Sequence, residues 1–375
     1  MRWAWWPLVT GAISAGLSIG GDRAAPLAHP CTWRVQAAPA RQMMAASATP
    51  QDEVPALLGA EGLQDDRVLA LVVTFEPELA VLERCIRALR GQGLQVLLVD
   101  NGSRNAERVA ELARTNGCRL IGNATNRGIA RALNQGLAAA RVRGMRWLWT
   151  FDQDTEILPT ARKAMTRVIE NLRARDHVAL VGIAHIDRQT GRDYQSNSRI
   201  SGPTGEIQVS AVITSGCMVN VDAANELGAF DERLFIDGVD HEFCMRARCN
   251  GWRLLRAVDS AAIHSMGELK RHELGPIVLH STNHSALRRY YMARNTLAIV
   301  FRYSLRAPGQ CLRLLAVLGA TALTIALFER QKLVKITALV LGVMAYCRGE
   351  SGAAPARVVE RLRRPPSPPS LGDGT

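Results

Sequence analysis

The sequence contains no Cys-x-x-Cys pair and few aromatic residues, since Phe, Trp and Tyr make up only 5% of its 375 residues. Its eight cysteines are scattered along the chain, which disfavours a structural zinc site or a disulfide framework. A reducing cytosol is therefore the simplest compartment for this chain. No apolar run reaches the roughly 20 residues that a confident membrane-spanning helix needs.

Two common nucleotide-binding motifs are also missing. The first predicted strand leads into Thr74-Phe-Glu-Pro77. The G-x-G-x-x-G fingerprint of nicotinamide-dependent dehydrogenases is absent there, and so is the glycine-rich loop with a lysine that nucleotidyltransferases usually present. Both classes are disfavoured. The net charge of +12 permits an anionic partner. No helix-turn-helix, zinc finger or aromatic RNA-binding motif is legible, so we expect no nucleic-acid partner.

The composition is ordinary for a globular protein, with 47% hydrophobic and 21% charged residues. It divides the chain into four regions. Residues 1–66 are rich in Ala, Pro, Gly and Ser and are expected to form a poorly ordered leader or a weak signal-like segment, or to reflect a mis-assigned start. Residues 67–284 are predicted to be the main domain and 285–350 a helical region. Residues 351–375 are predicted to be a disordered, basic, Pro-rich tail.

Short apolar runs alternate with amphipathic stretches in the main domain. The predicted strands are residues 68–74, 95–100, 118–122 and 146–151, and the predicted helices are residues 79–90, 106–116 and 128–143. Strands that are apolar on both faces and alternate with helices are typical of a parallel sheet covered by helices. The sequence therefore predicts an α/β domain with a mainly parallel sheet.

The helical region has a basic, amphipathic stretch at residues 287–306 and two apolar stretches at residues 311–328 and 333–346. These apolar stretches are compatible with an interfacial pair, a re-entrant hairpin, a membrane span, or a cap that packs on the main domain. The basic flanking residues favour contact with a membrane.

Polar residues follow each predicted strand. The strand ends carry Glu76, then Asp100, then the segment 126–128 (Asn-Arg-Gly), and then Asp152 with Asp154. In an open parallel sheet, ligands bind outside the carboxyl ends of the strands. Arg127 and Gly128 stand at a predicted helix start, where a guanidinium and backbone N–H groups can meet a phosphate.

The Asp152-Gln-Asp154 segment places two carboxylates one residue apart after an apolar strand. Mg²⁺ and Mn²⁺ prefer such oxygen ligands. The pair predicts a divalent-cation site that would neutralise a departing nucleoside diphosphate.

A second acidic group comprises Asp237, Asp240 and Glu242, before and within a predicted helix. One carboxylate there is explained by helix capping. Three carboxylates within six residues repel one another and favour a catalytic interpretation, with Asp240 able to take a proton from an attacking hydroxyl.

Six segments in order resemble family 2 glycosyltransferases, over about residues 67–305. They are Val-Val-Thr74-Phe-x-Pro77, Val99-Asp-Asn-Gly-Ser103, Asn126-x-Gly-Ile-Ala-x-Ala-x-Asn134-x-Gly136, Phe151-Asp-Gln-Asp-Thr155, Ser215-Gly216, and Phe235-Ile-Asp-x-Val-Asp-x-Glu-x-Cys-x-Arg246. Asp-Gln-Asp-Thr, Phe-Ile-Asp-x-Val-Asp and Tyr290-Tyr-Met-Ala-Arg-Asn295 are similar to the rhamnosyltransferase branch of this family.

This resemblance implies a GT-A fold, which is a Rossmann-like, mainly parallel sheet flanked by helices, followed here by C-terminal apolar and amphipathic helices. It also implies an inverting, metal-dependent transfer. The implied roles are as follows: Thr74, Glu76, Asp100, Asn126, Arg127, Gly128 and Asp152 bind the donor nucleotide; Asp152, Asp154 and His264 bind Mg²⁺ or Mn²⁺; Asp240 is the general base; Asp237, Glu242 and Arg246 contact the acceptor or support the base. Many members have Glu-Asp where this chain has Val239-Asp240, so the base assignment depends on the aspartate alone.

The branch resemblance implies dTDP-L-rhamnose as donor and a cell-surface polysaccharide or lipid-linked glycan as acceptor. Nucleotide sugars are made in the cytosol, so the expected location is the cytoplasmic face of the inner membrane. Two alternatives stay open: a glycosyltransferase with another UDP- or GDP-sugar donor, and a non-catalytic, membrane-associated sugar-binding scaffold.

Overall fold

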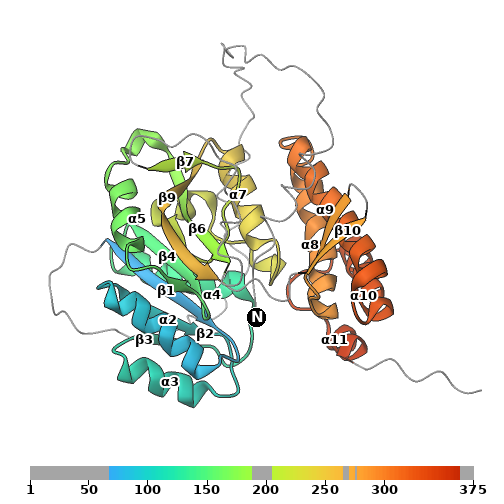
Figure 1. Cartoon of the computed structure of the whole chain (residues 1–375), viewed down its shortest axis with the longest axis horizontal. Coiled ribbons are helices and arrows are strands. Elements are labelled where there is room, and N and C mark those ends of the chain that lie inside the picture. The colour runs from blue at the N-terminus through green and yellow to red at the C-terminus, as the bar shows by residue number, and fades with distance from the viewer. Residues whose placement is uncertain (1–66, 188–204, 265–269, 275–276, 364–375) are drawn as a thin grey trace, which may run out of the picture. The chain divides into compact units, whose positions relative to one another are not determined.

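The computed structural model describes residues 67–187, 205–264, 270–274 and 277–363 (Figure 1). The predicted leader at residues 1–66 and the last 12 residues of the predicted tail lie outside the described residues.

A nine-stranded sheet forms the main domain, and its first four strands are parallel, as the sequence pattern predicts. They lie in the order β3-β2-β1-β4, and every neighbouring pair in this group is parallel. Their bounds are β1 Val68–Thr74, β2 Gln95–Asp100, β3 Arg119–Gly122 and β4 Trp147–Asp152. The carboxyl ends of β1, β2 and β4 therefore meet at one edge of the sheet, since Thr74 pairs with Asp100 and Val73 with Asp152.

The second half of the sheet is mixed. Strand β8 runs antiparallel to both β4 and β6, whereas β6 and β9 are parallel. Strands β5 and β7 pair antiparallel with β9. The bounds are β5 Glu156–Ile157, β6 Val178–Asp187, β7 Glu206–Gln208, β8 Cys217–Asn220 and β9 Arg253–His264. The predicted parallel arrangement thus holds for one half of the sheet.

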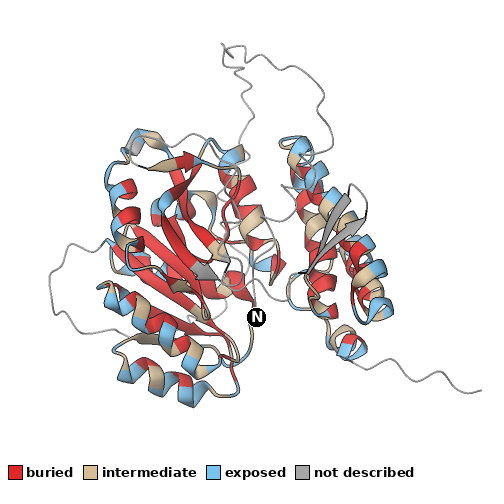
Figure 2. Ribbon diagram, viewed as in Figure 1, coloured by how far each residue is buried: buried red, intermediate tan, exposed pale blue. Residues whose placement is uncertain are grey.

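Helices cover both faces of the sheet because its central strands are apolar on both sides. Leu69 and Leu71 of β1 pack with α4 (Ile129–Val142), α6 (Val221–Leu227) and α7 (Val239–Cys249). The alternate residues of β1 pack with α2 (Leu79–Gly91), α3 (Ala106–Thr115) and α5 (Ala161–Glu170). Figure 2 shows the buried residues concentrated along these strands. Helices α2, α3 and α4 occur where the sequence predicts them.

Four helices follow the main domain: α8 Ala286–Tyr303, α9 Pro308–Phe328, α10 Lys332–Cys347 and α11 Ala356–Arg363. A small hairpin of β10 (Lys270–Leu274) and β11 (Ile277–Ser281) precedes them. The first three helices lie on the three stretches that the sequence pattern singles out. Helix α8 is their shared partner, since apolar side chains of α8 pack with both α9 and α10.

A buried group of charges closes the turn between α9 and α10. Arg289 of α8 and Lys335 of α10 both form ion pairs with Glu329, and Glu329 is fully buried. Lys335 also donates to Asn283 Oδ1 at 2.5 Å. Each buried charge thus has a partner of opposite sign or a hydrogen bond, which burial requires.

The prediction that the tail is disordered from residue 351 is wrong for its first part. Residues 356–363 form α11, and Leu362 is buried in a cluster with Tyr291 of α8. The Ala354 N–H donates to the Tyr291 hydroxyl at 2.6 Å, and Arg294 donates to the Gly352 carbonyl at 2.8 Å. These long-range contacts order a basic segment whose composition alone is typical of disorder.

Helix α9 is the single described helix that is long and apolar enough to cross a membrane, judged by its length and composition. Only 28% of its apolar window is buried. Its exposed side chains include Leu312, Leu315, Leu323 and Leu327. Core helices of soluble proteins pass the same test when they are mostly buried, and α9 is mostly exposed.

Gly342 sets the close approach of α10 to α8. A Cβ at this position would collide with the backbone oxygen of Tyr290 and crowd Ala293. We predict that Gly342→Ala lowers the free energy of unfolding by about 1–3 kcal/mol, because the two helices must separate. The measurement is the midpoint of thermal or urea unfolding.

Gly319 of α9 supplies the matched control, because a Cβ there meets no atom within 4 Å. Gly319→Ala should leave stability unchanged or raise it by about 0.5–1 kcal/mol through helix propensity. Equal effects of the two substitutions would contradict the packing explanation.

Candidate functional site

Asp100 ends β2 and is buried at the edge where the parallel strands finish. Its Oδ1 accepts from the Thr74 hydroxyl at 2.9 Å and from the Ser103 hydroxyl at 2.6 Å. Its Oδ2 accepts from the Ser103 N–H at 3.0 Å. The structure therefore brings the predicted residues Thr74 and Asp100 together, and much of the hydrogen-bonding capacity of Asp100 is used in joining two strand ends.

Asn101 ties the loops after β1, β2 and β3 to one another. Its N–H donates to the Thr74 carbonyl at 2.8 Å, and its side-chain Nδ2 donates to Asn126 Oδ1 and to the Gly128 carbonyl, each at 3.1 Å. Its Oδ1 accepts from the Arg127 N–H at 3.0 Å. The predicted segment 126–128 is thus held by its backbone and by Asn126, and Arg127 is exposed.

Glycine is required where these loops touch. Gly102 has φ +81°, and a Cβ there would lie 2.5 Å from the backbone carbon of Thr125. Gly128 has φ +85°, and a Cβ there would lie 2.6 Å from the Phe235 carbonyl oxygen. The same carbonyl accepts from the Ile129 N–H at the start of α4 at 2.8 Å. Helix α4 is therefore capped by the chain segment that leads to the acidic helix α7.

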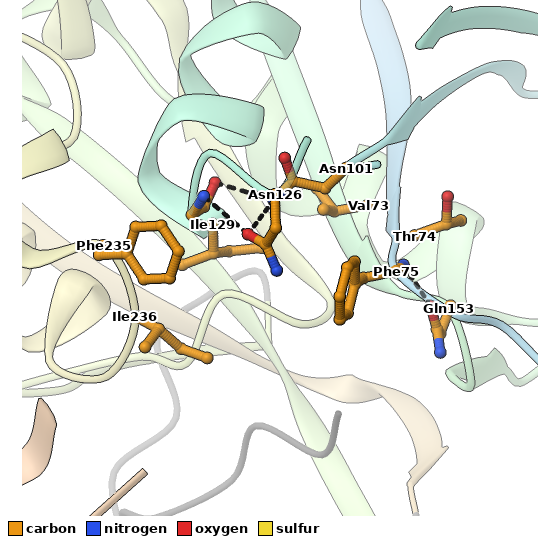
Figure 3. A pocket seen from close by; sticks show the side chains of 10 residues that line it. Val73, Thr74, Phe75, Asn101, Asn126, Ile129, Gln153, Phe235 and Ile236 are labelled. Carbon is orange, nitrogen blue, oxygen red and sulfur yellow. Dashed lines mark hydrogen bonds between the residues drawn. The ribbon is translucent and has the colours of Figure 1, made fainter. Parts of the chain in front are cut away.

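A pocket opens between these loops (Figure 3). Phe75 and Phe235 stand on opposite sides of it, and Thr74, Asn101, Asn126 and Gln153 supply polar groups. Gln153 accepts from the Phe75 N–H at 2.8 Å, which fixes the turn after β1. Apolar walls with a few convergent polar groups are typical of ligand sites. With a volume of about 30 Å³, the pocket itself has room for water.

Glu76 lies on the rim of this edge with φ +48°. It accepts from the Arg104 N–H at 3.0 Å and forms an ion pair with the exposed Arg104 guanidinium at 3.1 Å. These interactions with Arg104 lower the pKa of Glu76. The side chain is anionic and accessible, and it is paired within the chain.

Asp152 ends β4 and is 5% exposed. Its Oδ2 is buried and has no hydrogen-bond partner among the described residues. Burial raises its pKa well above the ordinary value, and the nearby charges of Asp154 and Asp240 raise it further, while Arg288 opposes this. The charge of Asp240 thus acts on Asp152, although about 90 residues separate the two along the chain.

The predicted metal ligands fit a cation in this respect: a buried carboxylate with an unpartnered oxygen beside a second carboxylate is stabilised by positive charge. Among the described side chains, no group of three or more His, Cys, Asp or Glu is placed to hold a metal. The third predicted ligand, His264, lies in β9 next to Ile263, which pairs with Glu156, two residues after Asp154. Its side chain lies outside the described residues.

Asp237 and Asp240 belong to a segment that α8 holds in place. Arg288 forms a buried ion pair with Asp237 at 2.9 Å. Burial raises the pKa of Asp237, and the charge and hydrogen bonds of Arg288 oppose this rise. Asp237 has φ +63° and Gly238 φ +81°, and this tight turn places Asp240 in the first turn of α7. Asp240 Oδ1 accepts from the His241 N–H at 2.9 Å.

Asn295 of α8 fixes the backbone of the same segment. Its Nδ2 donates to the carbonyls of Leu234, Ile236 and Asp237 at 2.7–2.8 Å. Arg294 donates to the Leu234 carbonyl at 3.1 Å. The Tyr290–Asn295 segment, which resembles the rhamnosyltransferase branch, therefore fixes the backbone of the acidic segment through hydrogen bonds.

Glu242 and Arg246 lie together on α7 and form a buried ion pair at 2.7 Å. Glu242 also accepts from the Tyr303 hydroxyl at 2.7 Å. Arg246 donates to the carbonyls of Leu227 and Ala229 at 2.5 and 2.6 Å. These contacts anchor α7.

Sequence reasoning gave no role to several residues that shape the site. Arg288 and Asn295 act across more than 50 residues of chain. The branch motif at 290–295 is a signal for Asn295, and Arg288 lies two residues before it. Gln153 lies in the sequence between Asp152 and Asp154, the two predicted metal ligands. Ser215 lies under β4, where its hydroxyl accepts from the Asp152 N–H at 3.3 Å.

The comparisons with known proteins identify the class. The model of the family described as Glycosyl transferase family 2 matches residues 70–227, which run from β1 to the end of α6. The chain is also 30% identical over 246 residues to the dTDP-rhamnosyl transferase RfbF of Shigella flexneri, covering 63% of this chain and 80% of that protein. The chain belongs to glycosyl transferase family 2, and it is a glycosyltransferase. The family expected from the sequence motifs is confirmed.

The solved structures that match this chain include S. aureus TarS. It has 17% identity and a TM-score of 0.45, and the match covers 79% of this chain and 50% of that chain. TarS 1–349 in complex with UDP-GlcNAc has 15% identity and a TM-score of 0.43, with coverage of 76% and 92%. GalNAc-T7 with UDP, GalNAc and Mn²⁺ has 16% identity and a TM-score of 0.42, with coverage of 53% and 43%. The chain spans half or less of two of these three chains.

We predict that Arg288→Gln lowers the free energy of unfolding at neutral pH by about 3 kcal/mol, because it leaves a buried carboxylate without its counterion. The raised pKa of Asp237 gives the sign of the pH dependence. The loss should shrink as the pH falls towards the ordinary aspartate value, because protonated Asp237 needs no counterion. Urea unfolding across this pH range measures both effects.

Arg114→Gln removes an exposed ion pair with Glu111 and serves as the control, for which no measurable change is expected. Adding Asp237→Asn to Arg288→Gln should restore part of the lost stability. A double variant no more stable than Arg288→Gln alone would contradict the assigned pairing.

Proposed function

We propose that the chain transfers L-rhamnose from dTDP-L-rhamnose to a hydroxyl of a cell-surface polysaccharide or lipid-linked glycan, with inversion at the anomeric carbon. The similarity to a dTDP-rhamnosyl transferase supports the donor. The observation that carries the chemistry is the buried Asp152 carboxylate at the end of β4, which has an oxygen without a partner among the described residues and on which the charges of Asp154 and Asp240 act. Carboxylates there would hold the cation that a donor diphosphate needs, and one of them would take the proton of the acceptor hydroxyl.

The nucleoside of the donor would bind at the mouth of the pocket between Phe75 and Phe235. An aromatic side chain can stack on a base, and Thr74, Asn101, Asn126 and Gln153 offer hydrogen bonds to the base or ribose. Asp100 would act mainly by holding this edge, and Glu76 by presenting a carboxylate at its rim. Arg127, exposed beside Gly128, would meet a phosphate.

A divalent cation, Mg²⁺ or Mn²⁺, would be held by Asp152 and Asp154, with His264 as a third ligand. When bound, it would supply positive charge against the departing diphosphate. The burial of Asp152 supports this proposal, because a carboxylate taken from water with an unpartnered oxygen is stabilised by a nearby cation.

Asp240 would act as the general base. It lies in the first turn of α7, and its charge acts on Asp152. From there it would take the proton of the acceptor hydroxyl as that oxygen attacks the anomeric carbon. Attack opposite the leaving diphosphate accounts for inversion in one displacement. Asp237, Glu242 and Arg246 would keep α7 in the required place.

The catalytic domain would work at the cytoplasmic face of the inner membrane. The exposed leucines of α9 and the exposed Leu333, Val340, Val343 and Met344 of α10 support membrane contact. The inner side of α9 packs along α8, and Glu329 at its end is sealed by Arg289 and Lys335. This packing favours helices that lie in the membrane surface over a single helix that crosses it.

A donor with a UDP or GDP leaving group is the alternative within the same class, and a scaffold that binds sugars without transfer is the alternative outside it. A panel of nucleotide sugars titrated by calorimetry, with Mn²⁺ and then with chelator, separates them. Preference for dTDP-L-rhamnose supports the proposal, preference for another donor replaces only the sugar, and binding without any transfer would favour the scaffold.

Asp154→Asn should weaken metal-dependent binding of the donor by at least about tenfold while the protein stays folded, because it removes a charged oxygen ligand. Calorimetry with and without Mn²⁺ measures the effect. Asp222→Asn, at an exposed position on α6, is the control that removes the same charge elsewhere. Undiminished metal-dependent binding by Asp154→Asn would rule out the proposed metal pair.

Asp240→Asn should keep the donor affinity and reduce the transfer rate by about 10²–10⁴-fold, the usual effect of removing a general base. Donor affinity is measured by calorimetry and transfer by release of the nucleoside diphosphate in the presence of acceptor. If donor affinity falls together with transfer, Asp240 is a donor or metal ligand and not the base.

A further inference from the structure

A second cavity lies between the end of α7, opposite its acidic first turn, and the turn from α8 to α9. It is open to solvent and has a volume of about 590 Å³. Its charged lining residues are Arg248 of α7, Arg306 in the α8–α9 turn and Arg313 of α9, and its lining includes no carboxylate. These three residues and their cavity are called the arginine pocket below.

The charges of the arginine pocket are not compensated within the described part of the chain. No ion pair involves Arg248, Arg306 or Arg313 there, and the one hydrogen bond of their side chains is a long one, 3.5 Å, from Arg248 to the Ser210 carbonyl. Other arginines close by in sequence are paired, such as Arg246 with Glu242 and Arg302 with Asp231. Three like charges around one cavity favour an anion, and guanidinium groups suit phosphate oxygens.

The start of α9 adds to this preference. Pro308 occupies its first turn, no side chain caps it, and Gly309 and Gln310 line the pocket with the arginines. The amino end of a 21-residue helix carries a partial positive charge. This contribution reinforces the site that the three guanidinium groups already form.

Exposed apolar side chains stand next to the arginines of the arginine pocket in the sequence. Leu305 is 97% exposed, immediately before Arg306, and Leu312 is 69% exposed, immediately before Arg313. The exposed leucines of α9 continue from there along the helix. A soluble phosphate compound without an apolar part would make no favourable contact with these leucines. A lipid presents an anionic phosphate and an apolar chain at the same place, and it matches both features.

We propose that the arginine pocket binds the phosphate group of an anionic membrane lipid, with Leu305 and Leu312 entering the acyl region beside it. The inference rests on the membrane-surface location proposed above and goes further by assigning the headgroup chemistry and its residues. The pocket would anchor the end of α7 and the start of α9 to the same membrane surface.

The test is binding of the full chain to vesicles of phosphatidylcholine alone and of phosphatidylcholine with phosphatidylglycerol, measured by co-sedimentation. The variant Arg248→Gln/Arg306→Gln/Arg313→Gln should bind the anionic vesicles roughly 100-fold more weakly than the wild-type chain, since each basic residue near such a surface contributes about fivefold. Its circular dichroism and its donor affinity should be unchanged, because none of the three residues lies at the donor site.

The control is Arg84→Gln/Arg108→Gln/Arg175→Gln, which removes the same charge from exposed positions of the main domain. It should keep the preference for anionic vesicles. Equal losses by the two triple variants would overturn the pocket in favour of general surface charge. Equal binding of the wild-type chain to both kinds of vesicle would overturn the pocket and leave the membrane location standing.

Two further outcomes separate the sources of phosphate and the two proposals. Calorimetric binding of inorganic phosphate or pyrophosphate that the pocket variant loses, without any preference for anionic vesicles, would overturn the lipid and assign a soluble phosphate. Absence of binding to either vesicle would overturn both the membrane location and the lipid site. Sugar transfer to a soluble acceptor would still test the catalytic proposal independently.

Discussion

The side-chain amide of Asn295 holds the backbone on which the rest of the site depends. It donates to three carbonyls of the segment 234–237, where Phe235 and Asp237 adopt positive φ angles that non-glycine residues rarely adopt. Such a conformation persists only where its surroundings determine it. The Phe235 carbonyl in turn caps α4, and the turn at Gly238 starts α7. One amide on α8 thus fixes the segment that joins the start of α4 to the start of α7.

Burial decides which carboxylates of this molecule are available for chemistry. Asp237 and Glu242 are buried and matched by Arg288 and Arg246. Asp152 is buried and has an oxygen without a hydrogen bond in the described chain. A buried carboxylate without a matching group is costly unless a ligand supplies the charge. Asp237 and Glu242 are thus matched within the fold, whereas Asp152 has an oxygen that the described chain leaves without a hydrogen bond.

The parallel half of the sheet and the polar strand ends could be predicted from the sequence because their signals are local. Val68–Thr74 is an apolar strand in itself, and Asp152 follows its strand directly. The antiparallel strand β8 could not be placed, since its pairing with β4 joins segments about 70 residues apart. The structural roles of Arg288 and Asn295 could not be predicted for the same reason, because they depend on contacts with residues far away in sequence. The helix α11 is ordered by Tyr291 and Arg294, which its own composition does not reveal.

The contact between Asn295 and Leu234 spans 61 residues. During synthesis, the parallel strands β1 to β4 emerge well before α8. Elements whose partners are nearby in sequence form first. The nascent chain can therefore complete the edge around Asp100 and Asn101 while the acidic segment still lacks its holder. The edge of the parallel strands would therefore be complete before the acidic helix α7 is fixed, and the two parts of the site mature at different points of one chain's assembly.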